Sequence, residues 1–123
     1  MSQIILIEDD LFFSSKIENI LKNSEYDLKI FPRGIEALKS LRENPAILIL
    51  INLASHSLNP LKLISEIKAD PDLKIIPISG YCGHTQKELV EKARNLGCDK
   101  MVPNSVMVSA LPKLLNQLFQ AKI

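Results

Sequence analysis

Polar side chains directly follow several short apolar runs of this sequence, and their types could support chemistry. They are Glu8 and Asp9 after the run 4–7, Asn52 after the run 46–51, Ser79 after the run 75–78, and Asn104 after the run 101–102. Adjacent carboxylates are costly unless a positive charge lies between them, and Mg²⁺ is a hard cation that carboxylate oxygens bind. The pattern therefore indicates a polar site that could hold a divalent ion weakly.

Two interpretations of the acidic segment stay open at this point. In the first, Glu8 and Asp9 bind Mg²⁺ weakly together with Ser79, the carbonyl oxygen of Asn52 and water molecules. In the second, these carboxylates lie in a solvated loop or cap a helix, which is the role we expect for Asp10. A flavin or nucleotide would need a loop rich in Gly, Ser or Thr here, and acidic residues would repel its phosphate. No other cofactor is expected.

The elements that must position these side chains are short apolar runs alternating with segments of helical periodicity. The expected strands are 4–7, 28–31, 46–51, 75–78 and 101–102. The run 46–51 is apolar throughout, as in a central strand covered on both faces. Apolar stripes predict helices between and after the runs. One helix is expected to have Thr85 as its N-cap and Gly97 just after its end, and the last is expected to begin near Pro112.

Five strand–helix units with short connections predict an α/β fold. Right-handed crossovers then give a doubly wound parallel sheet with helices on both sides. In such a sheet, ligands bind outside the carboxyl ends of the strands, where the strand order reverses. The polar residues that follow the strands are therefore expected to lie at one edge of the sheet.

Composition narrows the classes of protein that this chain could be. It has 123 residues, 46% of them hydrophobic, so we expect a single domain over 1–123. The net charge of +1 argues against binding to nucleic acid through bulk charge. We expect no membrane span and no leader, because no apolar run is long enough and no cleavage pattern is present. Cys82 and Cys98 lack the spacing of a zinc or redox motif, and we expect a cytoplasmic protein.

Four segments, in the right order and spacing, resemble the motifs of response-regulator receiver domains. They are IILIEDD at 4–10, LILINL at 48–53, IPISG at 76–80 and GCDKMV at 97–102. The resemblance covers the whole length of the chain. It implies a flavodoxin-like, three-layer (βα)5 fold with strand order 2-1-3-4-5, and a place in two-component signalling or a phosphorelay.

The residues that carry phosphorylation in receiver domains are changed in this sequence. Asn52 occupies the position of the phosphorylated aspartate, and an amide is neither a competent nucleophile nor an anionic metal ligand. Asn104 aligns with the lysine that pairs with the phosphoryl oxygens. Ser79 aligns with the hydroxyl of the switch, whereas Met101 stands where the switch aromatic usually is. The resemblance therefore implies an atypical receiver with a degenerate phosphorylation site.

The leading hypothesis is a stand-alone pseudo-receiver that acts through protein–protein interaction and is not an enzyme. Its expected partner is another signalling protein, such as a kinase, an output domain or a scaffold. The chain itself is expected to be a monomer or a weak homodimer. In the resemblance, the partner-binding face would include Lys87, Glu91, Arg94, Val106, Met107 and Lys113.

Two alternative functions belong to other classes. The first is a phosphorylation-dependent receiver whose acceptor was changed to Asn52 by engineering or recent mutation, and the absent lysine speaks against it. The second, more remote alternative is a flavodoxin-like enzyme that binds a cofactor. The acidic loop after the first strand speaks against this one, because it offers no cradle for a phosphate.

Overall fold

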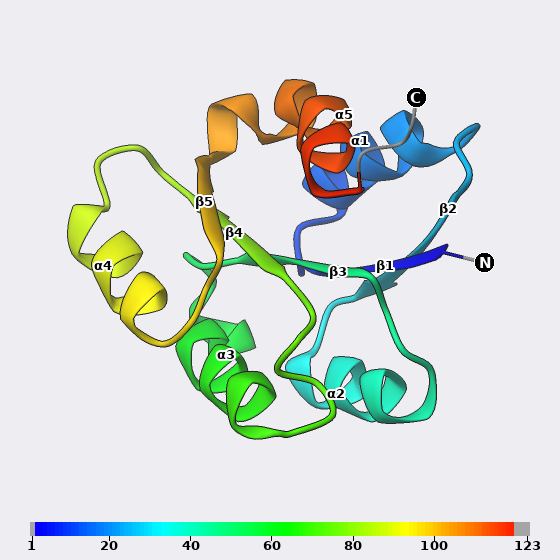
Figure 1. Ribbon diagram of the computed structural model, residues 1–123. Helices are drawn as coiled ribbons and strands as arrows, with labels where there is room; N and C mark the ends of the chain where they lie inside the picture. The colour runs from blue at the N-terminus through cyan, green and yellow to red at the C-terminus, as the bar shows by residue number, and fades with distance from the viewer. Residues whose placement is uncertain (1, 120–123) are drawn as a thin grey trace.

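The computed structural model describes residues 2–119, which form a five-stranded parallel sheet between two layers of helices (Figure 1). The strands are β1 (Ser2–Ile7), β2 (Tyr26–Phe31), β3 (Leu48–Asn52), β4 (Ile78–Cys82) and β5 (Lys100–Pro103). The helices are α1 (Leu11–Leu21), α2 (Gly34–Glu43), α3 (Pro60–Ala69), α4 (Lys87–Asn95) and α5 (Asn104–Phe119), with a short 3-10 turn at His56–Leu58. The strand order β2-β1-β3-β4-β5 confirms the predicted doubly wound fold.

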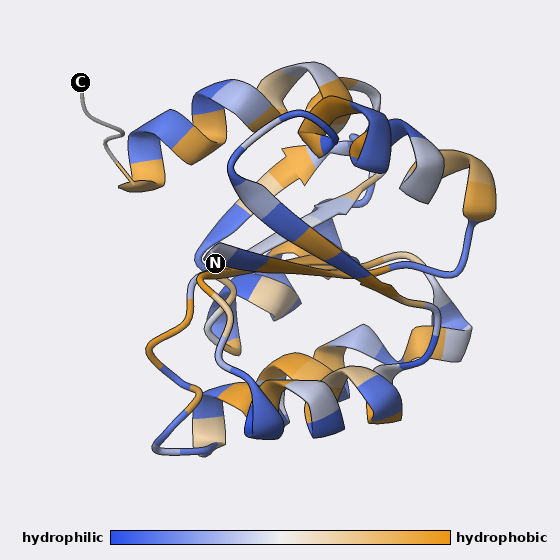
Figure 2. Ribbon diagram, turned by 90° about the vertical axis from the view of Figure 1, so that its right-hand side faces the viewer, coloured by the Kyte–Doolittle hydropathy of each residue, from blue (hydrophilic) through white to orange (hydrophobic). Residues whose placement is uncertain are grey.

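The central strands β1 and β3 are apolar on both faces because helices cover both sides of the sheet. One set of their side chains packs with α2, α3 and α4, and consists of Ile5, Ile7, Ile49 and Ile51. The alternate set packs with α1 and α5, and consists of Ile4, Leu6, Leu48 and Leu50. Figure 2 shows hydrophobic segments running through the sheet between the two helix layers. This double burial explains why these strands read as continuous apolar runs.

The strand order reverses at β1, which has β2 on one side and β3 on the other. The register of β1 and β3 pairs Ile7 with Ile51, so the next residues, Glu8 and Asn52, come side by side at the carboxyl end of the sheet. Asp10 then begins α1 as its N-cap, because its side chain accepts hydrogen bonds from the backbone N–H groups of Phe12 and Phe13. The predicted cap is confirmed.

The fourth strand differs from the prediction. We expected 75–78, whereas β4 is Ile78–Cys82, and Ile75 lies in a turn with 84% of its side chain exposed. The segment before β4 closes through backbone bonds to Asp70, which hold it as a turn. Three of the residues 75–78 are isoleucines, which suit a strand, but Pro77 has no N–H to donate to a neighbouring strand. Pairing of Ile49 with Ile78 places the strand later in the chain.

Two helix starts also differ from the prediction. The expected Thr85 cap is wrong, because α4 begins at Lys87 and no side chain caps its first turn. The last helix begins at Asn104 and not near Pro112, which lies inside α5. Gly97 does follow α4 with a positive φ of 110°, as a C′ glycine does, and the N–H of Cys98 bonds the carbonyl of Ala93.

Candidate functional site

Glu8 is the centre of the polar site at the carboxyl end of β1. Its side chain is only 2% exposed. One carboxylate oxygen accepts a hydrogen bond of 2.6 Å from the hydroxyl of Tyr81. The other accepts one from Nδ2 of Asn52 and one from the backbone N–H of Asp10, both at 3.0 Å. Three donors therefore surround this buried carboxylate.

Tyr81 belongs to this site because it pairs with Asn52 in the register of β3 and β4. Its ring stacks on Phe13 of α1, with the centroids 4.8 Å apart and the planes at 25°. Burial, followed by the hydrogen bond to Glu8, raises the pKa of Tyr81 far above its ordinary value. The hydroxyl stays protonated and therefore acts as a donor.

Asn52 uses both ends of its amide in this arrangement. Nδ2 donates to Glu8, and Oδ1 accepts a 2.9 Å hydrogen bond from the backbone N–H of Ala54. This second contact is an Asx turn, which starts the loop after β3. The amide therefore joins the end of β1 to the end of β3.

Asp9 is exposed and faces the loop that follows β3. One of its oxygens accepts hydrogen bonds from the hydroxyls of Ser57 and Ser55, at 2.6 and 2.8 Å. The bond from Ser57, and then that from Ser55, lowers the pKa of Asp9 below its ordinary value of 3.8. Asp9 therefore tethers this loop to the end of β1.

The replacement Ser57→Ala is expected to raise the pKa of Asp9 toward 3.8, because it removes the stronger of the two hydroxyl donors. Because the pKa of Asp9 is lower in the folded than in the unfolded protein, its ionised form stabilises the fold at pH values above the unfolded-state pKa. This stabilisation disappears as the pH falls through the folded-state pKa. Titration of the Asp9 carboxyl carbon by NMR measures the shift. The exposed Ser65 on α3 provides the control Ser65→Ala. An Asp9 titration unchanged by Ser57→Ala would contradict the tether.

Ser79 does not lie where the sequence predicts. It is the second residue of β4, it is 1% exposed, and it pairs with Leu50, two residues before Asn52. Its placement at the strand end is therefore wrong, because the strand starts three residues later than expected and ends at Cys82. Tyr81 takes the place beside Asn52. A longer strand assignment through the β-favouring Tyr81 would have indicated this residue from the sequence.

The positions aligned with the family lysine and aromatic lie on β5 and the start of α5. Asn104 is the first residue of α5 and is exposed. Met101 is half-buried in β5, pairs with Gly80, and packs against the core formed with α2, α3 and α4. Neither residue supplies a positive charge to the end of the sheet.

Most of the predicted partner-binding residues are exposed. Lys87, Glu91 and Arg94 of α4 line a groove of about 390 Å³ between α4 and β5. Lys113 of α5 is exposed, as is 42% of Val106. The prediction that Met107 belongs to this exposed face is wrong, because its side chain is fully buried in α5. The helix α5 starts at Asn104, early enough to turn the side chain of Met107 into the core.

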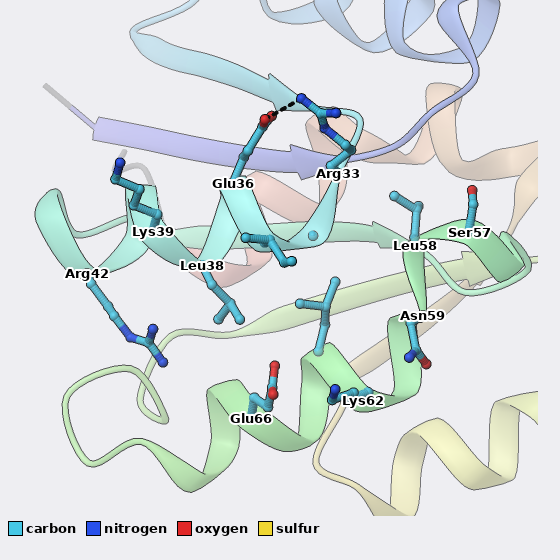
Figure 3. Close-up of a pocket in the computed structure, with 13 residues that line it drawn as sticks. Arg33, Glu36, Leu38, Lys39, Arg42, Ser57, Leu58, Asn59, Lys62 and Glu66 are labelled. Carbon is cyan, nitrogen blue, oxygen red and sulfur yellow. Dashed lines mark hydrogen bonds and ion pairs between the residues drawn. The ribbon is translucent and has the colours of Figure 1, made fainter.

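A larger groove, of about 960 Å³, lies between α2 and α3 (Figure 3). It contains none of the site residues predicted from the sequence. Arg33 and Glu36 form an ion pair of 2.5 Å on its α2 side. Its charges are mixed, with Glu66 and Lys62 on the α3 side, so the groove does not form a site for one kind of ion.

The chain is similar in sequence to known signalling proteins over most of its length. The response regulator receiver domain family matches residues 4–116. The chain belongs to this family. The polar-differentiation response regulator DivK of Brucella anthropi is 24% identical over 105 residues, which cover 85% of each protein. Within residues 2–119, no helix is long and apolar enough to cross a membrane.

Solved receiver structures share the fold. A response regulator from Hahella chejuensis aligns with a TM-score of 0.88 and 14% identity, over 98% of this chain and 97% of that one. The receiver domain of the sensor histidine kinase PA1611 from Pseudomonas aeruginosa aligns with a TM-score of 0.85 and 20% identity, over 98% of both chains. That receiver was solved with a magnesium ion in its active-site cleft. In this chain, Glu8, Asp9 and Asn52 lie at the carboxyl edge of the sheet.

The side chains at this edge do not fit Mg²⁺ in the arrangement that the sequence predicts. Both oxygens of Glu8 accept hydrogen bonds, Oδ1 of Asn52 accepts one from the backbone, and Ser79 lies elsewhere. Across residues 2–119, no cluster of three or more His, Cys, Asp and Glu side chains forms a possible metal site. Magnesium requires nearly octahedral oxygen ligands at short distances. A magnesium ion would therefore have to compete with these hydrogen bonds for the same oxygens.

Proposed function

We propose that this chain is a pseudo-receiver, a signalling domain that binds another protein without being phosphorylated at Asn52. The observation that carries the proposal is the amide of Asn52 at the end of β3, with both of its polar atoms engaged. An amide nitrogen is not nucleophilic, and it cannot form the mixed anhydride that a carboxylate forms with a phosphoryl group.

The electrostatics of the site support the same conclusion. Transfer of a phosphoryl group needs positive charge or donors aimed at its oxygens. Asn104, at the position of the family lysine, carries no charge, and the nearby Glu8 is acidic. A phosphoryl group at Asn52 would therefore lie near the carboxylate of Glu8, and residue 104 would supply no positive charge to balance it.

The proposed partner is another signalling protein, such as a kinase, an output domain or a scaffold. Support comes from the groove between α4 and β5, where charged side chains of α4 surround the less polar Met101 and Val102. Such a rim of charge around an apolar floor is typical of protein interfaces. A monomer or weak homodimer in the cytoplasm remains a prediction from the sequence.

The absence of phosphorylation is tested by incubating the protein with acetyl phosphate and Mg²⁺ and measuring the mass of the intact chain. We expect no gain. A matched sample of the variant Asn52→Asp tests the alternative of an altered but otherwise working receiver. A stoichiometric phosphoryl group on the native protein would refute the proposal, and rapid phosphorylation of Asn52→Asp would favour the alternative.

Reversal of charge at Arg94 tests the partner-binding face. The variant Arg94→Glu is expected to lose most of the partner that the native protein captures from its own cells, because charge reversal in a rim disfavours the complementary surface. The partner is identified by mass spectrometry, and its affinity is then measured with purified protein. Lys39→Glu on α2 is the control of equal charge change. Equal affinity of Arg94→Glu and the native protein would exclude this face.

A further inference from the structure

We infer that Tyr81 and Asn52 together replace the metal ion of the site, holding Glu8 by hydrogen bonds in a closed arrangement that needs no cation. This inference rests on the proposed function, because it explains how a receiver without phosphorylation keeps the end of its sheet in one state. The side chains of Glu8, Asn52 and Tyr81 form this arrangement, the polar lock.

A buried carboxylate needs compensation for the water that it loses. Glu8 is 2% exposed, and the ion pairs found among residues 2–119 join other carboxylates to Arg33, Arg42, Lys68 and Arg94. Its compensation therefore comes from neutral donors. Hydrogen bonds to an ionised oxygen are shorter and stronger than those between neutral groups, and the 2.6 Å contact to Tyr81 has this short length.

The position of the tyrosine hydroxyl is fixed from two directions. The β3–β4 register places Tyr81 beside Asn52, on the face of the sheet covered by α1 and α5. Stacking on Phe13 then holds the ring, which is 1% exposed. The strand register and the packing of the ring against α1 therefore hold the hydroxyl of Tyr81 beside Glu8.

The polar lock removes the ligands that a divalent ion would use. A cation at Glu8 would compete with the hydroxyl of Tyr81 and the amide of Asn52 for the carboxylate oxygens, and a displaced hydroxyl of Tyr81 would be left buried without its partner. Such a group costs free energy because it has lost water as well. Asp9 remains exposed, but a single carboxylate with one oxygen bound to two serines is a weak site.

Binding of Mn²⁺, followed by electron paramagnetic resonance, tests the polar lock. The native protein is expected to bind no Mn²⁺ at millimolar concentrations. The variant Tyr81→Phe frees one oxygen of Glu8 while keeping the stacked ring, so we expect binding to tighten about tenfold or more. Tyr26→Phe, at the partly exposed tyrosine of β2, is the matched control and should behave as the native protein does.

A second measurement needs no variant. The hydroxyl proton of Tyr81 is expected to exchange slowly and to give an NMR signal that millimolar Mg²⁺ leaves unchanged. A shift or loss of this signal with Mg²⁺ would overturn the inference. Tight Mn²⁺ binding by the native protein, or a folded Tyr81→Phe variant that binds no better than the native protein, would overturn it also.

The two proposals fail separately in these experiments. Phosphorylation of the native protein by acetyl phosphate would refute the pseudo-receiver, whatever the metal result. An unphosphorylated native protein whose Tyr81→Phe variant gains no metal affinity would refute only the polar lock. In that case, the contact between Tyr81 and Glu8 would serve only to join the ends of β4 and β1 across β3.

Discussion

Replacing Ile49 with alanine is expected to lower the free energy of unfolding by about 3 to 4 kcal/mol, the range for a buried isoleucine that leaves a cavity. Ile49 is fully buried in β3, the central strand of the sheet. It pairs with Ile5 on one side and Ile78 on the other, so neighbouring strands prevent collapse into the space. Urea denaturation, monitored by circular dichroism, measures the loss.

Ile75 gives a matched control for this prediction. It is the same residue type, but 84% of it is exposed in the turn before β4. Ile75→Ala is expected to change the unfolding free energy by about 0.5 kcal/mol or less. Equal losses at the two positions would contradict the placement of β4, because a strand over 75–78 could have buried Ile75.

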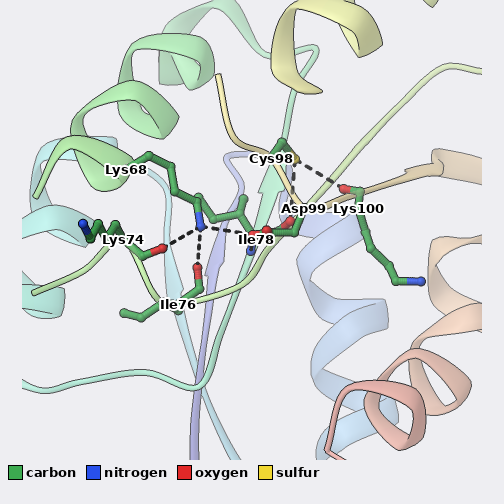
Figure 4. Close-up of polar contacts among 7 residues, drawn as sticks. All are labelled: Lys68, Lys74, Ile76, Ile78, Cys98, Asp99 and Lys100. Carbon is green, nitrogen blue, oxygen red and sulfur yellow. Dashed lines mark hydrogen bonds and ion pairs between the residues drawn. The ribbon is translucent and has the colours of Figure 1, made fainter. Parts of the chain in front are cut away.

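Replacing Lys68 with methionine is expected to lower the unfolding free energy by about 2 kcal/mol, because it leaves several acceptors without their donor. Nζ of Lys68 donates to the carbonyls of Lys74 and Ile76 at 2.9 and 3.0 Å, and to Asp99 at 3.1 Å (Figure 4). The same oxygen of Asp99 accepts from the backbone N–H of Ile78 at 2.8 Å. The hydrogen bonds of Lys68 therefore connect the turn before β4 with the segment before β5.

The control for this second prediction is Lys62→Met on the same helix. Lys62 is exposed, and the replacement changes charge and side chain in the same way. Its effect is expected to stay within about 0.5 kcal/mol. Both variants are compared with the native protein by urea denaturation at matched ionic strength. A loss no larger for Lys68→Met than for Lys62→Met would contradict the role of this contact.

These two variants separate the stability of the domain from its site. Neither Ile49 nor Lys68 takes part in the hydrogen bonds that join Glu8 to Asn52 and Tyr81. A partly destabilised but folded variant should therefore keep the metal and phosphorylation behaviour of the native protein. If the loss of stability also changed metal binding or phosphorylation, the site would depend on the overall stability of the domain and not on its own hydrogen bonds.

The order of the elements could be predicted from the sequence because hydrophobic periodicity is a local signal. Strands buried on both faces must be apolar throughout, and the residues of β1 and β3 satisfy this rule at every position before Glu8 and Asn52, apart from Ser2 and Gln3. Right-handed connections then limit the topology. The loss of the acceptor aspartate is also a property of the sequence alone, because it depends on the identity of residue 52.

The register of β4 was decided by tertiary structure. The isoleucines of 75–78 favour a strand there, whereas Pro77 disfavours it, and Gly80 weakens the case for 78–82. Pairing with β3 places the strand at 78–82. That choice moves Ser79 into the core and brings Tyr81 beside Asn52. The early start of α5, which buries Met107, depends in the same way on packing against the sheet.

The residue pattern is enough to predict that Glu8, Asp9 and Asn52 follow two central strands, and residue 52 is an amide by its identity. The hydrogen bond from the hydroxyl of Tyr81 to Glu8 becomes visible only in the folded chain. Strand register and the stacking of Phe13 fix this contact, and both depend on residues distant in sequence. Local patterns specify which elements form, whereas packing specifies which side chains meet.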